Sequence, residues 1–128
     1  MVIDTSVLLA VLFGEPDGAG LLETLLAQPR LQLSIGSRLE TSLVVEGSRF
    51  GAPADTVDQL IAQLGVVVVP FDDAQLHWAL RGWRLYGKGR HRAGLNLGDC
   101  FSYALAKALD RPLLFKGDDF CYTDVRVP

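Results

Sequence analysis

Short apolar runs separated by longer stretches of helical spacing form the pattern of this chain. Runs typical of strands lie at residues 2–3, 31–35, 66–69 and 112–115, and a short terminal strand is expected at residues 125–127. Apolar residues recur every three or four positions in the other segments, which predicts helices at residues 7–13, 17–28, 37–49, 53–64, 73–86 and 98–109. Because strands and helices alternate, we expect an α/β fold with a mostly parallel central sheet flanked by helices on both faces. At 128 residues the chain is predicted to form a single domain over residues 1–128.

Four acidic residues lie where a predicted strand gives way to a helix or loop: Asp4, Glu40, Asp99 and Asp119. The carboxyl ends of parallel strands meet at one edge of a sheet, so these side chains are expected to converge in the crevice there. A buried carboxylate must be paired with a cation or bound to a metal. Hard divalent cations prefer oxygen ligands, and the pattern therefore predicts a site for Mg²⁺, with Mn²⁺ as an alternative.

Each acid also has a purely structural interpretation. Asp4 could be the N-cap of the following helix, and Ser37 with Glu40 has the spacing of a capping box. Asp99 falls in the first turn of a helix, where the helix dipole stabilises an anion regardless of function. Asn96 is the expected cap of that helix, which leaves Asp99 to project into the crevice.

Polar neighbours of these acids are candidates for supporting roles. Thr5 and Ser6 follow the first acid and could orient its carboxylate, hold a metal-bound water or cap the next helix. Asp118 directly precedes Asp119. Adjacent side chains point in different directions, so only one of these two carboxylates is expected to reach a common centre.

Charge is distributed unevenly along the chain, although the formal net charge is only −3. No acidic residue lies between Asp73 and Asp99, and this interval holds both histidines and several of the basic residues. Its glycine-rich loop, residues 87–94, contains four candidates for binding nucleic-acid phosphates: Lys88, Arg90, His91 and Arg92. The alternative is a solvated surface loop, the usual role of a charge run.

Other function classes are disfavoured by the remaining composition. Cys100 and Cys121 form no CxxC pair and have no histidine cluster beside them, so neither a zinc site nor a disulfide is predicted. The apolar runs are too short to span a bilayer, and no basic segment precedes the first one, so we expect a cytoplasmic protein without membrane association. Trp78 and Trp83 are expected to be core residues, because their helix needs an apolar face.

Four segments resemble, in order and spacing, the PIN-domain ribonucleases and, within them, the VapC toxins of bacterial toxin–antitoxin pairs: VIDTSVLLAVLFGEPD, SRLETSLVVE, YGKGRHRAGLNLGDCFSYALAKA and PLLFKGDDFCYTDV. The resemblance places the family's acidic quartet on Asp4, Glu40, Asp99 and Asp119, because the last segment is similar to the pattern FKGxDF. Asp118 then takes the variable position, while Thr5 and Ser6 match the hydroxyl pair behind the first acid. The resemblance also implies a PIN-like Rossmannoid fold, a homodimer, a VapB-type antitoxin as partner and RNA as substrate.

The expected activity is metal-dependent hydrolysis of RNA phosphodiesters. One or two Mg²⁺ ions would be held by Asp4, Asp99 and Asp119, with Glu40 acting directly or through water. The basic loop would hold the backbone of a single-stranded or looped RNA near these ions. Two alternatives use the same residues differently: a phosphatase with Asp4 as the nucleophile, which lacks a second acid at Ser6, and a binding module without catalysis.

Overall fold

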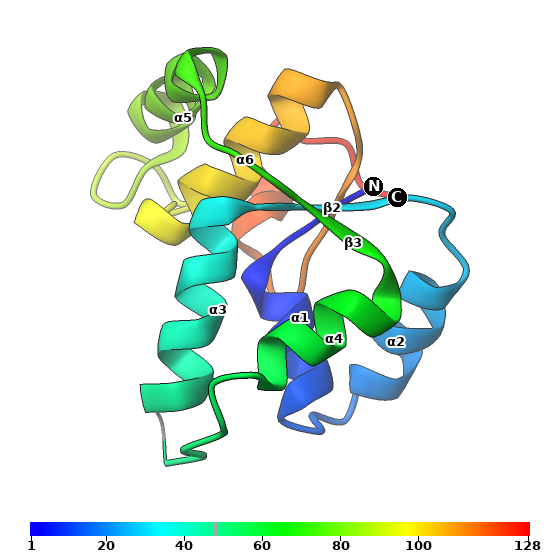
Figure 1. Cartoon of the computed structure of the whole chain (residues 1–128). Helices are drawn as coiled ribbons and strands as arrows, with labels where there is room; N and C mark the ends of the chain where they lie inside the picture. The colour runs from blue at the N-terminus through cyan, green and yellow to red at the C-terminus, as the bar shows by residue number, and fades with distance from the viewer. Residues whose placement is uncertain (48) are drawn as a thin grey trace.

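The computed structural model describes residues 1–47 and 49–128 and shows a parallel sheet surrounded by helices (Figure 1). The elements follow in the order β1 (Val2–Ile3), α1 (Thr5–Leu12), α2 (Gly18–Leu26), β2 (Leu31–Ser34), α3 (Ile35–Gly47), α4 (Thr56–Leu64), β3 (Val66–Val69), α5 (Asp73–Tyr86), α6 (Leu97–Leu109) and β4 (Leu113–Leu114). A short 3-10 helix, η1 (Asp119–Tyr122), lies after β4. The predicted α/β class is confirmed.

The first and last strands of the sheet are neighbours. The strand order is β3-β2-β1-β4, and every pairing between these strands is parallel. Val2 lies opposite Leu113 in β4 and opposite Gln32 in β2. All carboxyl ends therefore lie at one edge of the sheet, where side chains that follow β1, β2 and β4 can meet.

Two apolar clusters, one on each face of the sheet, form the core. Successive strand residues point to opposite faces, so Val2 packs in the cluster that contains Tyr103, and Ile3 packs with Leu8 and Leu25. The first cluster belongs to α5 and α6, and the second to α1, α2 and α4. Helices thus cover both faces at the centre of the sheet, whereas β3 is an edge strand in which Val67 is 59% exposed.

Helix α6 is packed closely between α3 and α5 because both neighbours present a glycine to it. A Cβ atom added at Gly36 of α3 would come within 2.5 Å of the Phe101 ring. One added at Gly82 of α5 would come within 2.5 Å of the Tyr103 ring. These two glycines let the aromatic side chains of α6 lie against the backbones of the neighbouring helices.

Several expected boundaries are wrong. The terminal strand at residues 125–127 does not form; that segment contributes one backbone hydrogen bond, from Leu113 N–H to Arg126 O at 2.9 Å. Helix α3 begins directly after β2 and ends at Gly47, whereas Arg49 lies in a turn and residue 48 lies outside the described residues. Within the described part of the chain, no helix has the length and hydrophobicity needed to cross a membrane.

Candidate active site

Asp4 directly follows β1 and is almost completely buried, with 5% of its surface exposed. Its Oδ2 accepts hydrogen bonds from the Ser6 backbone N–H at 3.0 Å and the Ser6 hydroxyl at 2.6 Å. Its Oδ1 accepts a third, from the hydroxyl of Ser102 at 2.6 Å. Asp4 is therefore the N-cap of α1, and the alternative that Thr5 or Ser6 caps this helix is wrong. Ser6 does orient the carboxylate.

Ser102 joins the acids through a buried hydroxyl network that sequence reasoning missed. Its Oγ lies 3.2 Å from Ser37 Oγ, and both serines are fully buried. The Ser37 carbonyl accepts hydrogen bonds from the hydroxyls of Thr5 at 3.4 Å and Thr41 at 2.8 Å. The network connects β1, α3 and α6, the three elements that carry Asp4, Glu40 and Asp99. The available signal was one serine inside the apolar run of α6, a turn after Asp99.

Glu40 points from α3 onto the start of α6. The proposed Ser37–Glu40 capping box is wrong, because Ser37 lies inside the helix and its hydroxyl contacts Ser102. The Glu40 carboxylate lies directly over Gly98, where an added Cβ atom would be 2.5 Å from Glu40 Cδ. Gly98 immediately precedes Asp99, so the absence of a side chain there allows two acids from different helices to approach one another.

Asp99 lies in the first turn of α6. Asn96 caps this helix as predicted, but the capping box includes Asp99: the Asp99 N–H donates to Asn96 Oδ1 at 2.9 Å, and the Asn96 N–H donates to Asp99 Oδ2 at 3.0 Å. One oxygen of Asp99 is thus used by the cap. The pKa of Asp99 is raised to about 6, first by burial and also by the charges of Asp4, Asp119 and Glu40, while the hydrogen bond with Asn96 lowers it.

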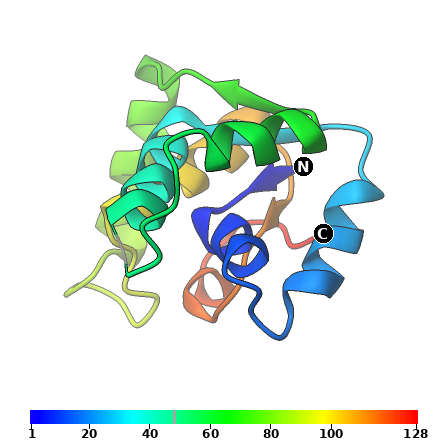
Figure 2. The same ribbon diagram turned by 60° about the horizontal axis from the view of Figure 1, so that its bottom comes forward.

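Asp119 is the first residue of η1, and Asp118 precedes that helix without a side-chain capping bond. Both are exposed, and it is Asp119 whose charge contributes to the raised pKa of Asp99. The turn that carries them is joined to the first acid, because the Lys116 N–H donates to Ser6 Oγ at 3.0 Å. Figure 2 shows the segment that contains η1 next to α1.

No basic side chain of the described residues forms an ion pair with any of the four acids. Lys116, close in sequence to Asp119, is paired instead with Glu15 and with Asp17 at 3.0 Å. Carboxylate oxygens that converge without a cation suit Mg²⁺ or Mn²⁺. As placed, however, no three Asp, Glu, His or Cys side chains in residues 1–47 and 49–128 are grouped closely enough to hold a metal ion. The charges fit a divalent cation, and binding one requires the carboxylates to move together.

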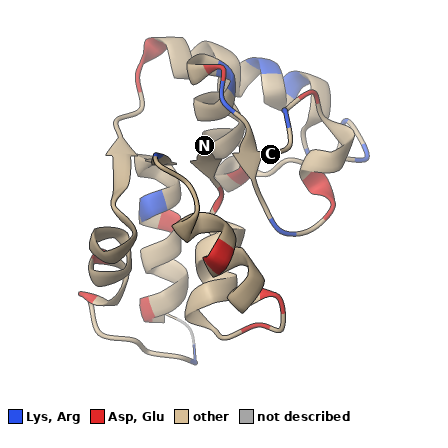
Figure 3. Cartoon of the chain, turned by 90° about the vertical axis from the view of Figure 1, so that its right-hand side faces the viewer, with Lys and Arg blue, Asp and Glu red and all other residues tan. Residues whose placement is uncertain are grey.

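The basic loop, residues 87–94, rests on aromatic rings. The guanidinium of Arg90 lies 4.1 Å from the centre of the Trp83 ring, and that of Arg92 lies 4.2 Å from the centre of the Tyr122 ring. His91 Nδ1 accepts a hydrogen bond from the Ala93 N–H at 3.1 Å. The prediction that Trp83 is a core residue is wrong, since 40% of its surface is exposed. Figure 3 shows most Lys and Arg positions in the upper part of that view, while Asp and Glu are more widely spread.

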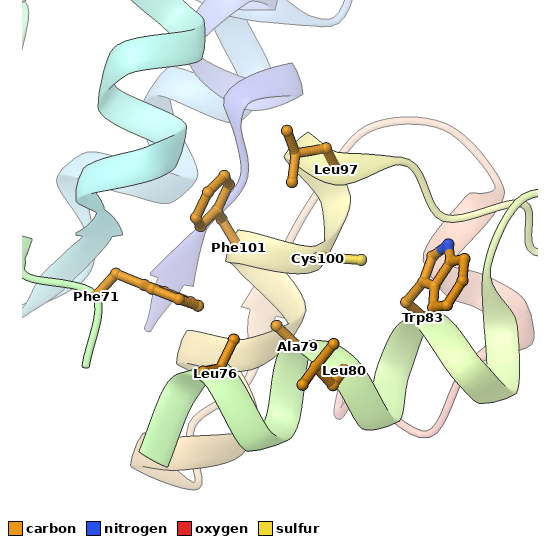
Figure 4. A pocket seen from close by; sticks show the side chains of 8 residues that line it. All are labelled: Phe71, Leu76, Ala79, Leu80, Trp83, Leu97, Cys100 and Phe101. Carbon is orange, nitrogen blue, oxygen red and sulfur yellow. The ribbon is translucent and has the colours of Figure 1, made fainter. Parts of the chain in front are cut away.

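An apolar hollow of about 420 Å³ lies between α5 and α6 (Figure 4). Its lining side chains come from the segment before α5, from α5 and from the first turns of α6: Phe71, Leu76, Ala79, Leu80, Trp83, Leu97, Cys100 and Phe101. A second hollow of about 300 Å³ shares Leu97 and Phe101 with it and extends to Glu40 and Gly98. An exposed apolar surface therefore borders the acids.

Comparison with known proteins gives consistent matches over nearly the whole chain. Residues 1–125 match the family described as PIN domain. The chain is 54% identical to Ribonuclease VapC of Mycolicibacterium smegmatis, over 98% of this chain and 97% of that protein. It is 48% identical to Ribonuclease VapC30 of Mycobacterium tuberculosis, over 98% of this chain and 95% of that protein.

Two solved structures have the same fold. A toxin-antitoxin complex from Klebsiella pneumoniae contains a chain that superposes with a TM-score of 0.72 at 16% identity, covering 99% of this chain and 95% of that one. VapC20 of Mycobacterium tuberculosis, described as a sarcin-ricin loop cleaving toxin, gives a TM-score of 0.72 at 18% identity and 98% coverage of both chains.

Proposed function

Since this chain belongs to the PIN-domain family and, within it, to the VapC ribonucleases, we propose that it is a metal-dependent endoribonuclease toxin. The observation that carries the proposal is the Glu40 carboxylate lying over Gly98, next to Asp99, in a set of four acids that have no cationic partner among the described residues: Asp4, Glu40, Asp99 and Asp119. Such a cluster is costly unless a divalent cation joins it.

Asp4, Asp99 and Asp119 would hold the ion, with Glu40 contributing directly or through water. When bound, Mg²⁺ or Mn²⁺ supplies an activated water and neutralises charge on the transferring phosphate. The chain itself orients the ligands: Ser6 and Ser102 fix the Asp4 carboxylate, and the Asn96 cap fixes one oxygen of Asp99.

The substrate in this proposal is single-stranded or looped RNA. Lys88, Arg90, His91 and Arg92 are all exposed on a loop that ends just before α6, the helix that carries Asp99. Cations in this position can bind phosphates on either side of the cleaved bond. A splayed strand can bring one phosphodiester into the acidic crevice, which a duplex cannot.

The proposal includes a VapB-type antitoxin and a homodimer. One protein of the same fold is described as part of a toxin-antitoxin complex. An arginine or lysine of the antitoxin would enter among the four acids, where a guanidinium can replace the metal's charge. Leu39, Leu43 and Leu97 are exposed beside the two apolar hollows, and this surface is suited to pairing with a second copy.

The test is RNA cleavage by purified protein with Mg²⁺, with Mn²⁺ and with a chelator. Asp4→Asn and Asp99→Asn should each abolish cleavage while the circular dichroism spectrum is unchanged, because each removes a carboxylate and keeps its volume. Asp119→Asn should cost far more activity than Asp118→Asn. Wild-type rates in the chelator, or a trapped phospho-Asp4 without RNA cleavage, would overturn the proposal in favour of other chemistry.

A further inference from the structure

Tyr122 has no role in the function proposed so far, although Arg92, one of the basic residues of the loop, contacts its ring. Tyr122 has 42% of its surface exposed, and the Arg92 guanidinium lies over its ring. Both side chains come from segments next to the acids in sequence, since Tyr122 belongs to η1 and Arg92 to the loop before α6.

The geometry of η1 places Tyr122 on the same side as Asp119. Side chains three residues apart eclipse one another in a 3-10 helix, so the first and last residues of η1 share a face. The turn that leads into η1 is joined to the residues around Asp4, because the Lys116 N–H donates to Ser6 Oγ at 3.0 Å. The Tyr122 ring therefore lies at the border of the acidic crevice, and Arg92 brings a positive charge to that border.

Arg92 has no carboxylate partner among the described residues. Its contact in the structure is with an exposed ring, and such contacts are weaker than a charge-assisted hydrogen bond to phosphate. The guanidinium is thus exposed and available to an incoming anion. Single-stranded RNA is bound by this combination, with bases stacked on tyrosine rings and phosphates paired with arginine.

We infer that Tyr122 and Arg92 form a binding subsite for one nucleotide of a single-stranded RNA, in which the base stacks on Tyr122 and Arg92 contacts its phosphate. This inference rests on the proposed ribonuclease function and assigns the subsite next to the acid of η1. Stacking tolerates any base, so the subsite fixes the position of the strand rather than its sequence.

Binding is measured by fluorescence anisotropy with a labelled single-stranded RNA that the wild-type protein cleaves, using an Asp99→Asn background so that the RNA stays intact. Tyr122→Leu should weaken binding about tenfold, whereas Tyr122→Phe, which keeps the ring, should bind normally. Arg92→Ala should lower the slope of log affinity against log salt by about 0.7, the value for one phosphate contact on a single strand. Arg84→Ala is the matched control, because it removes an exposed charge from α5 without such an aromatic contact.

A second arm identifies the stacked base directly. A series of RNAs is tested, each with a single abasic nucleotide at a different position. At one position, the abasic RNA should bind the protein that retains Tyr122 about tenfold more weakly than the intact RNA does. The Tyr122→Leu variant should bind this abasic RNA and the intact RNA with the same affinity. Equal losses in both proteins would overturn the subsite. Unchanged RNA binding by Tyr122→Leu would also overturn it, even if that variant no longer bound the antitoxin. Failure of the wild-type protein to cleave RNA would instead refute the underlying ribonuclease proposal.

Discussion

Asp4 is held by more donors than a helix cap needs. Its Oδ2 accepts from Ser6, as a cap requires, and its Oδ1 accepts from Ser102 across a sequence separation of 98 residues. Hydroxyl donors orient the carboxylate and, unlike a lysine, do not neutralise its charge. The proposed metal ion would therefore bind a carboxylate that these donors have already oriented.

Ser102→Ala removes the donor to Asp4 Oδ1 and leaves that buried oxygen without its partner. We expect a loss of about 1 to 3 kcal/mol in the free energy of unfolding, together with slower RNA cleavage. Ser37→Ala is the control, because it removes the neighbouring hydroxyl and keeps the Ser102–Asp4 hydrogen bond. Urea unfolding and cleavage rates measure both effects. Equal cleavage by the two variants would show that Ser102 does not position Asp4.

Asp99 predicts how stability depends on pH in the metal-free protein. Its pKa is raised from 3.8 to about 6 in the folded protein, so the protonated form is favoured by folding. Its contribution to stability is therefore largest at low pH and is lost as pH rises through about 6. Asp99→Asn should be more stable than the wild type above that pH, and the difference should disappear on acidification.

Urea unfolding in a chelator at about pH 4 and about pH 8 measures this dependence. Asparagine keeps an oxygen that can accept from the Asn96 N–H, so the helix cap is retained in the variant. A stability difference that is the same at both pH values would mean that ionisation of Asp99 carries no cost in the fold.

At the scale of elements, α6 is the helix around which the site is assembled. Glycines of α3 and α5 receive its aromatic side chains, and its own Gly98 receives the carboxylate of Glu40. The glycines at these positions therefore determine how closely the helices pack against one another. The closeness of this packing determines the distance between the Glu40 and Asp99 side chains.

Gly98→Ala should separate folding from activity. An added Cβ atom would collide with the Glu40 carboxylate, the mobile end of a long side chain, so the fold can be kept while that acid moves. We expect cleavage to fall between about tenfold and a hundredfold. Gly20→Ala is the matched control, because its added Cβ meets nothing within 4 Å. Loss of folding in Gly98→Ala, or wild-type cleavage, would contradict this role for Gly98.

The sequence predicts elements well where a local pattern decides them. Strand β3 and helix α5 have the expected limits, because four consecutive valines and a capped amphipathic run leave little choice. The segment at residues 125–127 has strand composition, yet its alignment with β4 gives a single backbone hydrogen bond. The sequence could not show this, because pairing depends on where the tail crosses the sheet.

The residues of the candidate site could likewise be predicted only in part. Asp4 and Asp119 follow β1 and β4 as expected, whereas Glu40 lies within α3, and Asp99 lies in the first turn of α6, which follows a loop and not a strand. Ser102 could not be predicted, because a serine in an apolar helix has meaning only when its tertiary neighbour is known. The cap at Ser37 was mispredicted because α3 follows β2 without a loop, which places Ser37 inside the helix.

At the scale of the whole molecule, one surface carries large apolar side chains that do not belong to the core. Leu43 on α3, Leu97 on α6 and Leu80 on α5 are all exposed around the two hollows. Large exposed apolar patches mark interaction sites on soluble domains. Pairing through this surface would place the acidic sites of two copies near one interface.

Leu43→Glu should convert the proposed homodimer to a monomer, because a charge would be buried at the interface. Light scattering after size exclusion should give twice the chain mass of 13.9 kDa for the wild type and the single chain mass for the variant. Leu26→Glu is the control, since Leu26 is equally exposed but lies on α2. A wild-type monomer, or dimers of both variants, would remove this surface from the proposed interface.

The pairing of β1 with β4 has a consequence for the cell that makes this protein. Ser6 and Lys116, which join the first acid to the last turn, are 110 positions apart. While the chain is being synthesised, Asp4 emerges early, but its site is incomplete until β4 and η1 have left the ribosome and paired. If the proposed site is correct, a partly made chain would lack part of it. The order of the strands would then delay activity until translation of the molecule is complete, which would give a partner time to be present.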